Sequence, residues 1–453
     1  MGKIKLWVWV ACFLLAVDAP ALANGFNLNG LGSRASAMGG AFVGLADDFS
    51  SPFWNPAGLA RLGKKTVGFF GAGLIPTGTY KLDWFGRIVA DAETPAQRYF
   101  AGMVSYGQPL GRRFAVGFGV YTPSALGTRW NGEDLKLITQ GTAYEWMSRV
   151  RMTTFSPAFA WRPSDRIQVG VALNINRAVF DFKTYAGAIQ LEIPSGSPGT
   201  AASPAEVILG QYAESLDGWG FGATVGMLFR PLDQLSVGLT FKTPSSVRFS
   251  GTAHVSNFEA MDLPADSDVT RRMTWPLWLA GGIAFTPTDR LTLTADVHFT
   301  NWKKLQSIES EYSVLAWKSL LAETGEDARP LRWDNTVQVR FGAEYRINSL
   351  SLRGGYAWDP SPAPDETMDI LTPSHDFDAY SLGLGYSLGG LQVDVSLEYL
   401  KSRRRVIPII LPRACLSGNV KGCFAHSTEN LENRPGYYAM RIWIPNISVS
   451  YRF

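Results

Sequence analysis

From Lys64 to the C-terminus, the chain alternates between apolar and polar residues in runs separated by breaks. The clearest run is LTLTADVHF at 291–299, where apolar side chains occupy the odd-numbered positions and polar side chains the even-numbered ones. Because successive side chains of a β-strand point to opposite faces, this period of two predicts strands with one apolar face. We identify fourteen strand-like runs, at 64–80, 97–108, 113–122, 150–162, 166–184, 217–230, 234–252, 271–286, 290–304, 335–347, 350–360, 377–388, 391–407 and 436–453.

The breaks between these runs alternate strictly between short and long. The short breaks are 109–112, 163–165, 231–233, 287–289, 348–349 and 389–390, and the long ones are 81–96, 123–149, 185–216, 253–270, 305–334, 361–376 and 408–435. An even number of strands, with short turns on one side and long loops on the other, is typical of bacterial outer-membrane barrels. We therefore predict an all-β membrane protein, a fourteen-stranded antiparallel transmembrane β-barrel whose two termini are periplasmic.

Composition supports this class. The chain is 46% hydrophobic but only 18% charged, whereas soluble proteins carry about 25% charged residues. No apolar run of 18 or more residues follows residue 23, which excludes a helical membrane protein. The net charge of +3 gives no indication of nucleic-acid binding.

The first 23 residues have the pattern of a secretory signal peptide. Lys3 and Lys5 precede an apolar stretch from Leu6 to Val17, and Ala21-Leu22-Ala23 forms a cleavage site. We expect residues 1–23 to be removed and the mature chain to reach the Gram-negative outer membrane.

Residues 24–62 do not alternate. They are rich in Gly, Ala and Ser and therefore do not suit a membrane-spanning strand. We predict that 24–62 forms a mostly helical plug, the hatch, inside a barrel formed by 63–453. An open hydrophilic porin has no use for such a segment.

Alternation directs seven charged side chains into the barrel. They are Asp296, Arg340, Glu344, Arg346, Arg353, Asp394 and Glu398. We expect them to pair with one another, brace the wall and hold the hatch, with Asp47 and Asp48 facing the arginines; contact with a ligand is the alternative.

Two cysteines remain after the signal peptide, Cys415 and Cys423, both in the last long loop. In an exported chain we expect a disulfide between them rather than a metal site. We expect no metal and no cofactor. We also expect no enzymatic activity, because three of the four histidines lie in or at the edge of loops and the fourth, His298, faces the lumen without a serine partner at a defined spacing. A lipid-modifying outer-membrane enzyme and a structural porin stand as the alternatives to transport.

Several motifs resemble the FadL family of outer-membrane transporters for long-chain fatty acids, including its TodX-type hydrocarbon branch. The motifs are Gly25-Phe26-Asn27-Leu28, Ala46-Asp47-Asp48, Asn55-Pro56-Ala57 and the segments 287–302, 341–347, 351–367 and 381–388. The resemblance covers essentially the whole mature chain. It implies passive uptake of hydrophobic compounds, with capture at extracellular loops and lateral release near a kinked third strand.

The resemblance suggests roles for several residues. Phe26 and Leu28 are expected to reach into the ligand cavity, and Asn55-Pro56-Ala57 to act as a hinge or latch, with a fixed structural turn as the alternative. Gly117 and Gly119 are expected at the lateral gap, with close packing against the hatch as the alternative.

The long loops supply further candidates. Ser203-Pro204-Ala205-Glu206 predicts the start of a helix. Apolar residues in this loop and the next are expected to form a capture groove or, alternatively, to cover one another as a lid; they are Val207, Ile208, Leu209, Tyr212, Phe258, Met261 and Leu263. Arg177 either pairs with a ligand carboxylate or contacts lipid head groups.

We expect four further features of the protein's surroundings. Its partners are a hydrophobic small molecule and outer-membrane lipid, and it acts as a monomer. The terminal Phe453 is expected to be recognised by the barrel-assembly machinery.

Overall fold

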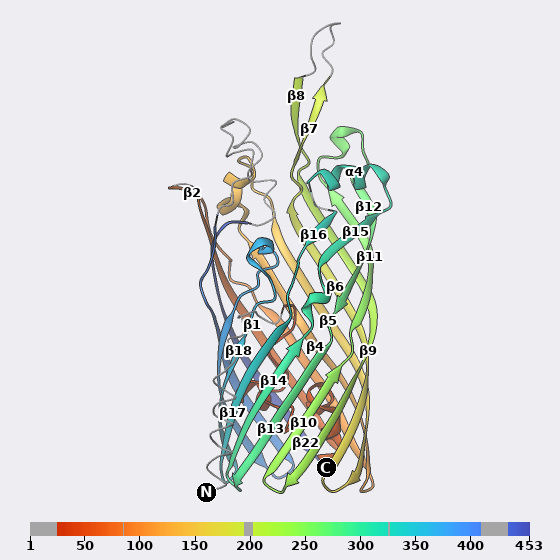
Figure 1. The fold of residues 1–453 in the computed structure, drawn as a ribbon, viewed down its shortest axis with the longest axis vertical. Helices are drawn as coiled ribbons and strands as arrows, with labels where there is room; N and C mark the ends of the chain where they lie inside the picture. Colours follow the sequence, from red (N-terminus) through yellow and green to blue (C-terminus); the bar gives the residue numbers. More distant parts are fainter. Residues whose placement is uncertain (1–24, 85, 194–202, 325–326, 409–433) are drawn as a thin grey trace, which may run out of the picture.

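The computed structural model describes residues 25–84, 86–193, 203–324, 327–408 and 434–453. The signal peptide and the Cys415–Cys423 pair lie outside the described residues. The main feature is a tall antiparallel barrel of fourteen wall strands (Figure 1). None of the helices in the described part of the chain is long and apolar enough to cross a membrane.

Each wall strand overlaps one of the predicted runs. Several extend into the predicted long breaks, and some are divided into two segments. In order they are β1 (Thr66–Trp84), β3 (Tyr99–Leu110), β4 (Phe114–Trp130), β5 (Trp146–Ser164), β6 (Ile167–Tyr185), β9 (Gln211–Leu232), β10 with β11 (Leu235–Lys242, Ser245–Val255), β12 with β13 (Asp266–Trp275, Trp278–Thr288), β14 with β15 (Leu291–Thr300, Ser307–Tyr312), β16 with β17 (Ala328–Pro330, Thr336–Ile347), β18 (Leu350–Asp359), β19 (Phe377–Leu388), β20 with β21 (Leu391–Ser402, Arg405–Ile407) and β22 (Gly436–Arg452). Strand β1 pairs with β22 on one side and with β3 on the other, so the sheet closes on itself.

Side-chain burial follows the predicted alternation. On β14, Leu293 and Val297 are 41% and 51% exposed on the outer face, whereas Asp296 and His298 are buried inside. Apolar side chains outside and polar ones inside are the arrangement of a barrel surrounded by lipid. The prediction of a transmembrane barrel is confirmed.

The long-loop end differs from the prediction at several places. A short additional strand lies there: β2 (Arg87–Glu93) pairs with the C-terminal part of β1. The segment predicted to start a helix at Ser203 is instead strand β8 (Ser203–Ile208), which pairs with β7 (Ala188–Ile193). The helix prediction is wrong because pairing with β7 supplies the backbone hydrogen-bond partners that a helix would have supplied locally.

The hatch consists of three short helices inside the barrel (Figure 1): α2 (Ser33–Ala37), α3 (Ser51–Trp54) and the 3₁₀ helix η1 (Pro56–Arg61). Its backbone lies against glycines of the inner wall. A Cβ added at Gly355 would lie 2.0 Å from the amide nitrogen of Gly39, and one at Gly238 would lie 2.2 Å from the carbonyl oxygen of Val43. Similar contacts occur at Gly170, Gly226, Gly282, Gly342 and Gly383.

Asn55 fastens the middle of the hatch to the wall. Its side-chain oxygen accepts a hydrogen bond from the amide of Ala57 at 3.2 Å, and its amide group donates to the carbonyls of Val43 at 3.1 Å and Met227 at 3.0 Å. Gly226 leaves room for this contact, since a Cβ there would lie 2.0 Å from the Asn55 oxygen. This geometry corresponds to the alternative in which the Asn55-Pro56-Ala57 segment is a fixed structural turn.

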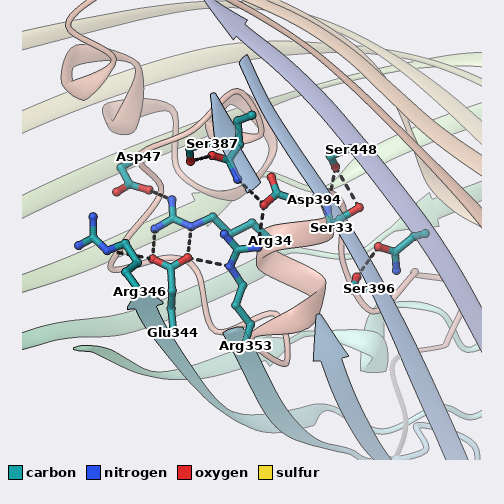
Figure 2. Close-up of polar contacts among 12 residues, drawn as sticks. Ser33, Arg34, Asp47, Glu344, Arg346, Arg353, Ser387, Asp394, Ser396 and Ser448 are labelled. Carbon is teal, nitrogen blue, oxygen red and sulfur yellow. Dashed lines mark hydrogen bonds and ion pairs between the residues drawn. The ribbon is translucent and has the colours of Figure 1, made fainter. Parts of the chain in front are cut away.

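A network of charges holds the first helix of the hatch (Figure 2). The Arg34 guanidinium donates to both carboxylate oxygens of Glu344 at 2.8 and 3.0 Å and to Asp47 at 2.5 Å. Arg353 donates to Glu344 and to Asp394, each at 2.7 Å. Glu344 on the wall therefore joins one arginine of the hatch to one of the barrel.

The predicted partners of the hatch aspartates are wrong. Asp47 pairs with Arg34 of the hatch itself and not with a wall arginine. Asp48 accepts hydrogen bonds from the amide and the hydroxyl of Ser50, at 2.8 and 2.6 Å, at the start of α3. Of the seven charges predicted to point inward, six are buried, while the side chain of Arg346 is 49% exposed and lies 3.9 Å from Glu344.

We predict that Glu344→Gln loosens the hatch. The change deprives two buried arginines of their shared carboxylate and costs about 3 kcal/mol, the low end for a broken buried ion pair, because each arginine keeps a second carboxylate. Single-channel recordings should show frequent openings, and amides between Ser33 and Arg61 should exchange faster with deuterium. Arg346→Gln, two residues further along β17, is the matched control and should behave as the unmodified protein. Equal conductance in both variants would show that the network does not hold the hatch.

Candidate functional site

Two of the cavities inside the described part of the barrel are lined by the N-terminal tail and are of equal size. Each has a volume of about 110 Å³. The tail residues Asn27, Leu28 and Asn29 line both cavities. The tail therefore forms a partition between two spaces that are large enough for small apolar groups.

The first cavity is predominantly apolar. Its lining comes from the tail and from several wall strands, and includes Phe26, Leu74, Val150, Phe377, Leu400 and Ile442. The loop between β18 and β19 folds over it, and its residues Leu371, Pro373 and His375 complete the lining. The indole nitrogen of Trp130 donates to the carbonyl of Ile370 at 2.9 Å and holds this loop in place. Burial, together with the nearby charge of Arg405, lowers the pKa of His375 to about 3, so its imidazole is neutral and suits an apolar cavity.

Phe26 is enclosed by tryptophans. Its ring centroid lies 5.0 Å from that of Trp333, 6.1 Å from that of Trp302 and 6.4 Å from that of Trp275. The family resemblance suggested that Phe26 and Leu28 reach into the ligand cavity, and both lie in the lining of the first cavity. The three tryptophans were not predicted from the sequence, because they come from separate strands and loops and share no local motif.

The second cavity contains a lysine. Lys242, at the end of β10, places its ammonium group 3.7 Å from the ring centroid of Phe53 and 4.4 Å from that of Trp278. Across the described ranges, Lys242 forms no ion pair. Contacts with aromatic faces stabilise such a cation only partly, so it is available to a negatively charged group.

Polar groups in and near the second cavity form hydrogen bonds with the hatch and the tail. Arg340 donates to the carbonyl oxygen of Asn29 at 2.6 Å, and Asp296 accepts a hydrogen bond from the amide of Val43 at 2.8 Å. His298 lies 3.3 Å from Asp296. Glu398, on the other side of the tail, accepts a hydrogen bond from the side chain of Asn29 at 2.8 Å. These inward charges brace the hatch and tail, as predicted. No cluster of three or more potential metal ligands occurs among the residues that the structure describes.

Strand β4, the third wall strand, contains a bulge at Thr122 and Pro123. Its pairing with β5 shifts register between Tyr121 and Ser124, and its pairing with β3 ends at Tyr121. A bulge adds one residue to a strand and leaves it unpaired. Here the carbonyl oxygen of Pro123 accepts a hydrogen bond from the amide of Leu28 at 2.9 Å, so the tail is bound directly to the bulge.

The glycines proposed for the lateral gap precede this bulge. A Cβ at Gly117 would lie 2.8 Å from the side chain of Leu59, so Gly117 accommodates the hatch. A Cβ at Gly119 would be 3.4 Å from the Tyr121 ring, an ordinary contact. Close packing against the hatch therefore explains why position 117 is a glycine.

The loop residues predicted to form a groove or a lid pack against one another. Leu209, Tyr212 and Phe258 are buried, and the Phe258 ring lies 5.0 Å from that of Trp317. Val207, Ile208, Met261 and Leu263 are partly buried against the same cluster. This mutual covering is the geometry expected of a lid.

Arg177 does not face the interior. It is exposed on the outer wall, 3.5 Å from Asp217 and with its guanidinium 6.0 Å from the Trp219 ring centroid. The prediction that it pairs with a ligand carboxylate inside the barrel is therefore wrong, because the strand keeps its outward phase at this position.

Comparisons with known proteins agree with this architecture. The model of the family described as outer membrane protein transport protein (OMPP1/FadL/TodX) matches residues 14–410. The long-chain fatty acid transport protein of Salmonella typhi is 22% identical over 421 residues, which cover 86% of this chain and 90% of that protein. Outer membrane protein P1 of Haemophilus influenzae is 24% identical over 262 residues, so this chain spans about half of its length, 54%.

Two solved structures share the fold. A FadL homologue of Pseudomonas aeruginosa superposes with a TM-score of 0.75 at 16% identity, over 95% of this chain and 100% of that one. The toluene transporter TbuX of Ralstonia pickettii superposes with a TM-score of 0.67 at 19% identity, over 94% and 100%. The family match, the closed barrel and the internal hatch lead to one conclusion: the chain belongs to the OMPP1/FadL/TodX family of outer membrane transport proteins of Gram-negative bacteria, which are transporters and not enzymes.

Proposed function

We propose that the protein carries hydrophobic compounds passively from the extracellular side into the outer membrane. The long-loop end is extracellular in this proposal, and both termini are periplasmic. The observation that carries the proposal is the hydrogen bond between Leu28 and Pro123, because it ties the partition between the two cavities to the bulge in the wall. A ligand that displaces the tail from the first cavity would release the same bulge.

Capture takes place at the loop cluster around Leu209, Tyr212 and Phe258. These side chains cover one another in the closed state and would separate to admit a hydrophobic ligand. The ligand then reaches the apolar cavity around Phe26, beneath the loop that contains Leu371.

Release is lateral, between β3 and β4. Above Tyr121 the two strands have no ladder pairing, and the proline at 123 has no amide hydrogen to donate. Tyr121 and Pro123 line the second cavity, so this stretch of wall separates the cavity from the lipid. A hydrophobic molecule moving down its gradient needs no other source of energy.

Lys242 favours substrates that carry a negative charge. Lys242 is half-buried and has no acidic partner among the described residues, so an anion that reaches it would stabilise its charge. A long-chain fatty acid supplies both a carboxylate and an apolar tail. We therefore propose that long-chain fatty acids, and not neutral aromatic hydrocarbons, are the preferred cargo.

We also propose that Phe453, 56% exposed after the end of β22, is presented to the barrel-assembly machinery, and that a single chain is the functional unit.

Deleting Pro123 tests the lateral route. The deletion removes the extra residue, so the pairing of β3 with β4 can continue past Tyr121. In a strain that lacks its own transporter, we expect uptake of labelled oleate to fall to the level of the empty strain. Gly119→Ala, which keeps the bulge, should transport normally. Folding is checked by heat-modifiable migration of the barrel, and normal uptake by a folded deletion variant would contradict the lateral route.

Lys242→Met tests the nature of the cargo. Methionine keeps the length of the side chain and removes its charge, so oleate uptake should fall about tenfold, the loss expected for one charge-assisted hydrogen bond. Uptake of toluene by the same cells should change little. A parallel loss for both compounds would mean that Lys242 supports the hatch and does not recognise a carboxylate, and unchanged oleate uptake would remove the argument for fatty acids.

A further inference from the structure

The outer wall carries a row of basic residues immediately above its apolar band. On β9, Phe221 and Trp219 are 68% and 50% exposed toward the lipid, and the next outward residue is Asp217. In register with Trp219 lie Arg177 of β6 on one side and Arg248 of β11 on the other. Exposed tryptophans mark the level of the lipid head groups in outer-membrane barrels, so these arginines lie at that level.

Arg248 faces another arginine. It pairs in register with Arg272 of β12, and both side chains are exposed on the outer face. Like charges directly opposite each other on neighbouring strands are destabilising. Among the described residues, neither guanidinium forms an ion pair. Of the nearby carboxylates, Asp217 pairs with Arg177 at 3.5 Å, while Glu311 and Glu309 accept hydrogen bonds from the hydroxyls of Thr270 and Ser307 at 3.4 and 2.7 Å.

The same arrangement recurs elsewhere on the barrel. Lys401 of β20 is directly opposite Arg441 of β22, and both are exposed. Immediately below them, the rings of Tyr399 and Trp443 lie 4.3 Å apart. Asp378, the residue across from Lys401 on β19, already contacts Arg403 at 3.5 Å and the Tyr356 hydroxyl at 2.7 Å. Two separate places therefore combine an aromatic residue at the membrane interface with an opposed pair of cations.

An anion from outside the chain would resolve this repulsion. Guanidinium groups bind phosphate through two parallel hydrogen bonds, and residues opposite each other in an antiparallel sheet have Cα atoms about 4.5–5.5 Å apart. Two such side chains can approach one phosphate from both sides. We propose that the Arg248–Arg272 and Lys401–Arg441 pairs are docking sites for a phosphorylated glycolipid of the outer leaflet, with its phosphates on the cations and its acyl chains along the apolar band.

This inference goes beyond transport and rests only on the proposed orientation, with the long loops outside. It assigns the lipid to the outer wall, whereas the cargo cavities are inside. The two can therefore fail independently: loss of lipid binding leaves the cavities intact, and loss of uptake leaves the outer wall intact.

The test uses the purified full chain in a neutral detergent. Native mass spectrometry counts bound bisphosphorylated lipid A during a titration. We expect two tightly bound copies for the unmodified protein. Arg248→Gln with Arg272→Gln should remove one copy and weaken binding at that site about tenfold or more, because charge-assisted hydrogen bonds are lost. Lys401→Gln with Arg441→Gln should remove the other copy.

Two controls distinguish the source of the phosphate and the place of binding. Arg166→Gln with Arg290→Gln removes two exposed arginines from the short-turn rim and should leave both copies bound. Dephosphorylated lipid A should bind weakly, and millimolar inorganic phosphate should not displace the lipid. The proposal is overturned if the Arg248–Arg272 and Lys401–Arg441 variants keep both copies of the lipid. It is also overturned if dephosphorylated lipid A binds equally well, or if inorganic phosphate displaces the lipid.

Discussion

The close approach of the hatch backbone to the inner wall is the constraint on which the rest of the structure depends. At Gly170, Gly226, Gly238 and Gly355, any side chain would overlap hatch atoms. Interiors this dense do not deform continuously, so the hatch fits the barrel in one position. That position fixes where the tail Phe26–Asn29 lies, and therefore where the two cavities are. The abundance of glycine in the chain follows from this contact as much as from turns.

Charge interactions also make it energetically costly for the hatch to leave this position. Glu344 and Arg353 are each 2% exposed and Arg34 is 15% exposed, so separating Glu344 from the two arginines breaks ion pairs that are largely removed from water. Moving the whole hatch during each transport event would break this network and the Asn55 contacts together. Movement of the tail alone breaks the Leu28–Pro123 hydrogen bond and the Arg340 contact to Asn29. The transport route proposed above therefore needs only the smaller movement, that of the tail.

The sequence predicts well what depends on local periodicity and poorly what depends on neighbours distant along the chain. Alternation on β14 gives the correct face for Asp296 and His298, and the alternation of short and long breaks gives the fourteen-stranded antiparallel barrel. Arg34 was missed because its partner Glu344 is 310 residues away. The helix predicted at Ser203 was wrong because its capping residues were judged without the partner strand β7. Arg177 faces outward, as the alternation of side chains along β6 predicts for its position.

The bulge in β4 is a place where the period-two pattern no longer predicts which side chains face inward. Before it, Ala115 and Tyr121 on odd-numbered positions are buried; after it, Thr128 and Trp130 on even-numbered positions are buried, and Arg129 is exposed. One inserted residue has exchanged the two faces of the strand. A wall that must stay sealed has no use for such an exchange, because each unpaired backbone group within the bilayer costs free energy. The hatch tail satisfies the Pro123 carbonyl from inside. In the proposed route a ligand displaces this tail, so that opening of the wall and occupation of the cavity are parts of one event.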